Sequence, residues 1–525
     1  MWNASRMTTQ SERVDAYAET ARYHRPWYWY DWANSAFVTT VGTVLFGPYI
    51  TTVAKEAACP GISSDDKCST PLYVVPAAEG LPGWVSTLAL VAVTVLLALL
   101  VVGIVAYVRG TRVPVRPAAV VVPLALAAVV LVLTAPLDPG SIAPYTVTLA
   151  TIASALILIV IGAIADRSRR PARLLGLFAW VGSAATIGLF FLVGTNWRFG
   201  AAMMIIASIS LGGSLVVYDA ILCRVASPDD RDRVSSRGWA LGYLGGGLLL
   251  AINLVIVSAP DLVGASTETA VRVSLLSAGL WWGVFTLIPV IGMWSLRGTP
   301  AGELDAPRAG MVRGSVAQLG HTFRDLRNYP NTLLFLLAYL FFNDGIQTVI
   351  TSSSTYGAEE LHFSQSQLIQ TILLVQFVAF GGALLFGRLA ARIGAWRSVL
   401  WSLGLWTVVV VLAYFVPSGA YLPFLALAVL IGIVLGGSQA LARSLYSQLV
   451  PVNREAEFFS LYQAMERGTS WFGMITFGLV HQLTHSYRWA ILALIVFFVL
   501  GGWLLSRVNM RQGILDAGNE VPQIV

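Results

Sequence analysis

Fourteen long apolar runs, each nearly free of Asp, Glu, Lys and Arg, constrain this chain of 525 residues more than any other feature. A bilayer core of about 30 Å requires about 20 consecutive apolar residues in each spanning helix. Charged residues make up 11% of the chain, against about 25% in soluble globular proteins. The runs therefore predict an all-α polytopic membrane protein and exclude a soluble enzyme. They lie near residues 30–53, 84–108, 117–136, 142–165, 174–194, 200–226, 237–258, 272–296, 330–355, 366–388, 397–416, 421–448, 459–482 and 487–507.

The basic residues between the runs predict the membrane topology. If the N-terminus is inside, most loop arginines are cytoplasmic, and the outside loops keep Lys55, Lys67, Arg198, Arg272 and Arg488. This asymmetry is what the positive-inside rule expects, and it places both termini in the cytoplasm. The formal charge of +6 is accordingly a topology signal, and we expect no nucleic-acid partner. No G-x-x-x-x-G-K phosphate loop occurs, and we expect no cofactor.

The two halves of the chain resemble one another at a nearly fixed offset. Leu211–Ser214 recurs as Leu435–Ser438, 224 residues later. The pattern Gly-x-x-x-x-Arg that starts at Gly162 recurs at Gly387, 225 residues later. A duplication therefore predicts two pseudo-symmetric six-helix bundles plus an extra helix pair. The predicted divisions are a cytoplasmic segment 1–29, a first bundle 30–296 with an inserted helix pair 84–136, a cytoplasmic linker 297–329, a second bundle 330–507 and a cytoplasmic tail 508–525.

One loop carries a recognisable signature. Gly162 to Arg170 reads GAIADRSRR, which resembles the G-x-x-x-D-R-x-G-R loop of the major facilitator superfamily. In that family's fold, two halves rock around a solute site between them. The resemblance makes Asp166, Arg167 and Arg170 gating candidates, because the carboxylate can cap a helix and pair with arginines. In the second copy Ala391 replaces the aspartate, so we expect the first copy alone to act as a latch.

Four further motifs indicate a narrower family. They look like the vacuole-effluxer-like branch of the superfamily, which is named for autophagy-linked amino-acid efflux. This resemblance implies a transporter of neutral amino acids. The motifs are Tyr30–Phe37 (YDWANSAF), Arg237–Gly247 (RGWALGYLGGG), Phe342–Thr348 (FNDGIQT) and Phe458–Gln463 (FFSLYQ).

Ionisable residues within predicted helices are candidates for function because they are costly in a bilayer. Asp344 lies about 20 Å into the helix that starts near Pro330, at mid-depth. Burial there favours the neutral carboxyl, so Asp344 is the leading proton-coupling candidate. The alternative is a structural hydrogen-bond network with Asn343 and Gln347. Asn34 and Asp31 complete this set, although the aromatic residues around Asp31 favour a position at a helix entry near the interface.

The repeat offset yields a gate hypothesis. Asp219 corresponds to Arg443 in the second half, so opposite charges occupy equivalent places in the two halves. We expect these two to close a cytoplasmic gate, the alternative being that each pairs within its own half. Glu466 and Arg467 are adjacent and cannot satisfy each other on a helix, and an Asp166–Arg467 contact is expected.

Cysteine and histidine spacing adds two smaller predictions. Cys59 and Cys68 flank a short polar loop and form a disulfide if that loop faces an oxidising compartment; the alternative is two free thiols. His481 and His485 have the spacing of a metal pair but no nearby carboxylate, which favours a solvated helix end and no metal site.

The sequence as a whole predicts a secondary transporter rather than an enzyme. Our interpretation is proton-coupled efflux of neutral amino acids through a bacterial plasma membrane, with a small-molecule substrate, protons and the lipid bilayer as partners. A drug or metabolite exporter of the same fold is the first alternative. A non-transporting scaffold or sensor is the second alternative. A passive bundle would not need the four carboxyls that lie within predicted helices, at Asp31, Asp219, Asp344 and Glu466.

Overall fold

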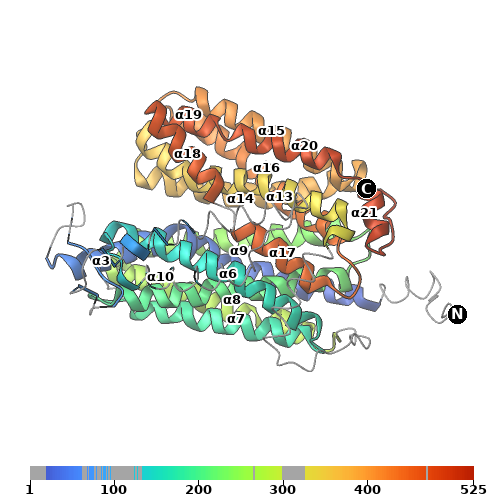
Figure 1. Cartoon of the computed structure of the whole chain (residues 1–525), viewed down its shortest axis with the longest axis horizontal. Helices are drawn as coiled ribbons and strands as arrows, with labels where there is room; N and C mark the ends of the chain where they lie inside the picture. Colours follow the sequence, from blue (N-terminus) through green and yellow to red (C-terminus); the bar gives the residue numbers. More distant parts are fainter. Residues whose placement is uncertain are drawn as a thin grey trace. The chain divides into compact units, whose positions relative to one another are not determined.

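The computed structural model describes residues 19–61, 135–263, 266–297, 326–468 and 471–524, with single residues and short stretches between 68 and 134. The named elements in these ranges are all helical (Figure 1). Eleven helical segments of the described chain are long and apolar enough to cross a membrane. The predicted all-α polytopic class is therefore confirmed.

The first half contributes six of these spans. The first span combines α2, the π-helical segment η2 and α3. The bounds are α2 His24–Ala36, η2 Phe37–Leu45, α3 Phe46–Ala58, α6 Ile142–Asp166, α7 Pro171–Gly188, α8 Trp197–Val225, α9 Arg231–Ser258, α10 Thr267–Phe285 and α11 Leu287–Gly292.

The second half repeats this plan and ends in a short additional helix, α21. The bounds are α13 Pro330–Thr355, η8 Tyr356–Glu360 (also π-helical), α14 Gln365–Ile393, α15 Ala395–Phe415, α16 Tyr421–Gln448, α17 Glu455–Gly468, α18 Trp471–Thr484, α19 Tyr487–Leu492, α20 Ile495–Arg507 and α21 Met510–Asp516.

Local sequence signals explain where several helices begin. Pro171 and Pro330 are the first residues of α7 and α13, a position where the missing N–H of proline has no cost. Ser364 caps α14 through a capping box with Gln367. Gly394 separates α14 from α15 with φ of 90°, a conformation that glycine adopts without strain. These signals join consecutive spans through short, sharp turns.

The two halves meet mainly along α9. This helix packs against α2 in its own half and against α14 and α16 of the other half. Small residues permit the close approach: a Cβ on Gly387 of α14 would lie 2.8 Å from the Ser236 side chain of α9. The duplicated glycines found in the sequence are therefore packing residues of this fold.

Two boundaries differ from the sequence prediction. The first span begins before residue 30, with α2 starting at His24, because the polar and aromatic first turns lower its hydropathy. The run 459–482 is described as two helices, α17 and α18. The predicted segment 1–29, the helix pair 84–136 and the linker 297–329 lie partly or almost wholly outside the described residues.

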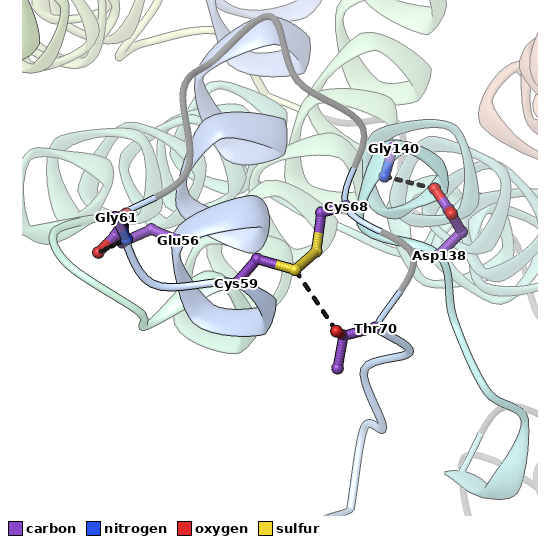
Figure 2. The surroundings of a disulfide bond; sticks show 7 residues. All are labelled: Glu56, Cys59, Gly61, Cys68, Thr70, Asp138 and Gly140. Atoms are coloured by element: carbon purple, nitrogen blue, oxygen red, sulfur yellow. Dashed lines mark hydrogen bonds between the residues drawn. A yellow bond between two sulfur atoms is a disulfide. The ribbon is translucent and has the colours of Figure 1, made fainter.

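A second compact unit comprises Gly47–Thr146 and Leu192–Ala202, the rest of the chain forming the first. Within it Cys59 and Cys68 are joined as a disulfide, with Thr70 Oγ1 3.4 Å from Cys59 Sγ (Figure 2). An antiparallel bridge joins Leu72 to Leu137. Arg198 Nε donates to Val74 O at 2.8 Å. Thus the pairing expected of the two cysteines is present in a segment that several contacts hold together.

Candidate functional site

A buried guanidinium of the second half contacts two carboxylates of the first half. Arg443 on α16 donates from Nη2 to Asp31 Oδ2 at 3.0 Å and from Nη1 to Asp219 Oδ1 at 3.4 Å. The three residues are at most 6% exposed. Tyr218 donates its hydroxyl to Asp31 Oδ2 at 2.8 Å, and Gln463 of α17 donates to Asp219 Oδ2 at 2.9 Å. We call Asp31, Asp219, Arg443, Tyr218 and Gln463 the Arg443 cluster.

Aromatic rings and a serine complete the surroundings of Arg443. Its Cζ lies 5.0 Å from the ring centroid of Trp27 and 5.4 Å from that of Trp239, within range of cation–π attraction. Its Nε donates to Ser235 Oγ at 3.0 Å, and Ser235 donates in turn to Ala440 O. The guanidinium is therefore held by first-half groups on several sides.

The pairing of Asp219 with Arg443, predicted from the repeat offset, is present in the structure. Asp219 does not pair with Arg224, whose Nη2 instead lies 3.6 Å from Glu455 Oε2 of the other half. A buried ion pair is weak evidence for stability, because apolar residues of similar volume often stabilise a core as well. The Asp219–Arg443 ion pair joins the two halves of the chain.

The sequence prediction that Asp31 stands at a helix entry is wrong. α2 begins seven residues before Asp31, so this carboxylate lies inside the helix rather than at its entry. The neighbouring aromatic residues are core residues: Trp27 stacks on Tyr218 with ring centroids 4.2 Å apart, and Tyr30 is fully buried. Of these residues, Trp27 lies against Arg443.

The same end of the bundle carries further contacts between halves. We call this end, around residues 223–232 and 444–457, the junction face. Arg231 Nη1 donates to Ser447 O at 2.8 Å, and Gln448 Nε2 donates to Pro228 O at 2.8 Å. Ser444 donates to the Asp232 carboxylate. The α16 residues from Leu435 to Gln448 are all buried, so the junction face is closed.

Asp166 of the predicted latch also lies at the junction face. Its two carboxylate oxygens accept from the backbone N–H groups of Ala456 and Glu457, both at 2.8 Å, at the N-terminus of α17. A carboxylate satisfies the unpaired N–H groups there and complements the helix dipole. The expected contact with Arg467 is wrong, because Arg467 is about 16 Å further along the helix axis. Gly162 permits the approach, since its Cβ would lie 2.6 Å from Ala456 O.

We expect Asp166→Ala to weaken closure of the junction face. The change removes both acceptors for the α17 N-terminus, and loss of an N-terminal cap costs about 0.5–2 kcal/mol. Alkylation of the buried Cys223 thiol, measured by intact mass, should therefore become several-fold faster. Ser168→Ala, which removes a hydroxyl from the same loop, is the matched control. Equal alkylation rates for Asp166→Ala and the parent would contradict a latch.

Asp344 occupies a different place in the second half. It is 0% exposed on α13, and its Oδ2 accepts from the backbone N–H of Gly473 on α18 at 2.8 Å. Its Oδ1 and the nearby Thr348 Oγ1 have no hydrogen-bond partner among the described residues. No salt bridge to Asp344 is present within the described chain. The carboxyl therefore lacks a countercharge and retains one unused acceptor.

The alternative network of Asp344 with Asn343 and Gln347 is not what the described side chains form. Asn343 Oδ1 instead accepts from Gln439 Nε2 on α16 at 3.0 Å. Gln347 is half-buried, and its carbonyl accepts from Thr351. Asn34 donates to Tyr30 O one turn earlier on α2, so this amide serves its own helix. Asp344 is thus separate from the neighbouring amides.

The remaining candidate residues have separate contacts or lie exposed. Glu466 accepts from the Tyr339 hydroxyl at 3.2 Å, which links α17 to α13. Arg467 is half-buried, and its Nε has no partner among the described groups. Arg167 and Arg170 are exposed beside the start of α7. His481 stacks on Tyr487 with ring centroids 3.9 Å apart.

Sequence reasoning missed several residues that complete the site. Both Tyr218, which lies in an apolar run, and Ser235, which lies in the predicted loop between two runs, are uncharged and were not singled out, although each contacts the buried charges. Gln463 stood in a recognised motif, but the motif does not indicate its partner. Arg231 was counted as a loop charge, whereas it is 3% exposed and joins the halves.

The comparisons with known proteins agree with this arrangement. The profile of the family described as "Vacuole effluxer Atg22 like" matches residues 19–518. The chain belongs to the Atg22-like vacuole effluxer family. Its members and its structural neighbours are major facilitator transporters, so this Atg22-like chain is a multi-pass membrane transporter and not an enzyme.

Individual relatives and structures support the same assignment. The Atg22-like chain is 32% identical over 366 residues to the uncharacterized MFS-type transporter YxiO of Bacillus subtilis (strain 168), covering 69% of this chain and 83% of that protein. It is 30% identical to autophagy-related protein 22 of Cryptococcus neoformans over 54% of each chain, about half that relative's length.

Solved structures show the shared fold. The human organic anion transporter MFSD10 (TETRAN) is similar with a TM-score of 0.54 at 16% identity, covering 93% of this chain and 99% of that one. The proton:xylose symporter XylE, bound to 6-bromo-6-deoxy-D-glucose, gives a TM-score of 0.56 at 12% identity, with 95% and 96% covered. The predicted major facilitator fold is confirmed.

Proposed function

We propose that this transporter exports neutral amino acids from the cytoplasm in exchange for protons, by alternating access. The observation that carries the mechanism is Arg443 of one half bonded to Asp31 and Asp219 of the other. In an alternating-access cycle the two halves separate at one face, and these bonds must break when they do. The Arg443 cluster is accordingly the gate.

Loop charges favour a cytoplasmic position for the junction face. Arg167, Arg169 and Arg170 lie just before α7 and Arg173 lies in its first turn, at the same end as Asp166. Such clusters are typical of cytoplasmic ends of helices. The same loop-charge topology assigns the disulfide segment 59–68 to the oxidising side, where disulfides persist. With this orientation the closed junction face blocks access to the transport path from the cytoplasm. Both termini are then cytoplasmic, and a bacterial plasma membrane is the proposed location.

Asp344 is the proposed proton site. A proton fits the unused Oδ1 without a countercharge, while Oδ2 stays bonded to Gly473 N–H. The hydrogen bond from the start of α18 links the state of this carboxyl to the position of α18. A proton taken up or released here would therefore change how α13 and α18 pack, which is what coupling requires.

The substrate class rests on the family. The chain belongs to the Atg22-like effluxers, and the resemblance to that branch implies neutral amino acids. An exporter of drug-like compounds remains the alternative within the same fold. No part of the gate or of the Asp344 site depends on which of the two substrates is carried.

Counterflow in proteoliposomes tests the proposal. We expect saturable counterflow of labelled leucine or tyrosine that an imposed pH gradient accelerates. Asp344→Asn should retain counterflow when the pH is equal on both sides. The acceleration caused by the pH gradient should fall at least about tenfold, because the amide cannot exchange a proton. Asp261→Asn, at an exposed carboxyl, is the control. Absence of counterflow would contradict neutral amino acids as the substrate. Undiminished acceleration in Asp344→Asn would contradict Asp344 as the proton site.

A further inference from the structure

The residues after the last spanning helix return to the junction face. α21 is anchored on the second half: Asn509 N–H donates to Asn331 Oδ1 at 3.0 Å, and Met510 and Ile514 are buried. A Cβ on Gly513 would lie 2.7 Å from Leu449 Cδ2 and 2.8 Å from Asn331 Cβ. The close packing of this short helix against α13 and the end of α16 fixes where the following residues begin.

The residues after α21 then continue across both halves. Asn519 Nδ2 donates to Gln448 O at 2.8 Å and to Val450 O at 2.7 Å, both in the second half. Four residues later, Gln523 N–H donates to Asp229 Oδ1 of the first half at 2.7 Å. The segment therefore bonds to both partners of the closed face.

The residues that the tail contacts themselves join the halves. Gln448, whose carbonyl receives Asn519, donates its side chain to Pro228 O and accepts from Arg231. Pro522 and Ile524 line one small cavity together with Asp232 of α9 and Leu445 of α16. The tail thus covers the place where the cytoplasmic ends of α9 and α16 meet.

We propose that residues 519–524 form an intramolecular strap that holds the junction face closed and slows its opening. α21 anchors the strap to the second half, and Asp229 belongs to the first half. Separation of the halves at this face must therefore break the Gln523–Asp229 bond and uncover the Asp232 cavity. The strap makes opening dependent on release of the C-terminal residues, so any factor that binds them would raise the open population.

A native thiol reports this opening directly. The chain has three cysteines, and Cys59 and Cys68 are joined. Cys223 is free and 8% exposed, with its Sγ 3.7 Å from Ser447 O of the opposite half. Without reductant, N-ethylmaleimide should therefore modify this single thiol, and it should do so mainly when the junction face opens.

The experiment compares alkylation rates of the full chain and of a chain ending at Gly518, both in lipid nanodiscs. We expect modification of Cys223 to become about two- to tenfold faster, because truncation removes the one hydrogen bond that joins the tail to the first half and the cavity lining of Pro522 and Ile524. Asp229→Ala, which removes one strap contact and leaves the tail intact, should give a smaller increase. Gln512→Ala on the exposed side of α21 is the matched control.

Misfolding of the truncated chain would also expose Cys223, so the full-length variant Asn519→Ala provides the second measurement. If Asn519→Ala elutes as the parent does and is alkylated several-fold faster, the strap is supported. If both the truncated chain and Asn519→Ala are alkylated at the parent rate, the strap is overturned. The readout needs neither substrate nor protons, so its failure is distinguishable from failure of the proposed transport function.

Discussion

Arg443→Gln should abolish counterflow, with a loss of at least about 100-fold. The change leaves Asp31 and Asp219 buried without a positive partner, and removing one member of a buried ion pair costs about 3–5 kcal/mol. The closed junction face should become the unstable state, so the transport cycle stalls. Counterflow in proteoliposomes and Cys223 alkylation measure the two consequences. Arg233→Gln, at an arginine whose side chain is 56% exposed, is the control.

Neutralising one carboxylate should reduce counterflow less than removing the guanidinium does. Asp219→Asn keeps one carbonyl oxygen, which can accept from Arg443 or from Gln463 but not from both, while Asp31 continues to balance the charge of Arg443. We expect counterflow within about tenfold of the parent, because one hydrogen bond to a charged group contributes about 1.5–3 kcal/mol and part of it is retained. Equal losses for Asp219→Asn and Arg443→Gln would contradict this account.

The geometry also determines how a charge exchange must be designed. Exchanging Asp219 and Arg443 places a carboxylate opposite Asp31, because Arg443 contacts both aspartates. The double variant should therefore remain inactive, and adding Asp31→Asn should recover part of the counterflow. Full recovery in the double variant alone would show that Asp31 is not part of the gate.

The second large effect is expected for Gly436→Ala, which should lower stability far more than the same change at its repeat counterpart. A Cβ on Gly436 would lie 2.2 Å from Ala379 O and 2.7 Å from Ala383 N, both in the α14 backbone. Backbone cannot rotate away, so α14 and α16 must separate, and we expect a loss of about 3 kcal/mol, at the upper end of overpacking costs.

Gly212→Ala is the matched control for this prediction. Its Cβ would lie 2.9 Å from the terminal carbons of Leu158, which is a flexible side chain that can change rotamer. We expect a loss of about 1 kcal/mol. Thermal unfolding of both variants in the same detergent measures the difference, and equal shifts would show that the backbone contact does not limit packing.

The membrane fold and the Asp219–Arg443 pairing could be predicted from the sequence for physical reasons. A charge-free run of bilayer length is characteristic of a spanning helix, so these helices were predictable. The internal duplication placed Asp219 and Arg443 at equivalent positions, and equivalent positions face one another in a fold of two like halves. The pairing could therefore be predicted without coordinates.

Several contacts could not be predicted, because their partners leave no pattern in the sequence. Asp166 and Asp344 accept from backbone N–H groups at the starts of α17 and α18, and nearly every residue type supplies such a group. Asp31 was misplaced because the aromatic residues before it are common both at membrane interfaces and in cores. The tail contacts depend on how α21 packs, which hydropathy does not encode.

The junction face also has a consequence for how the sequence can drift over generations. Arg231, Ser235, Gln448 and Asn519 all donate to main-chain carbonyls. Replacing an accepting residue preserves its carbonyl, so these bonds do not require a particular side chain at Ala440 or Ser447. Burial still restricts both positions to small residues. Homologues can therefore exchange these two for other small residues while retaining the side chains that donate to them, and each half keeps its contacts with the other.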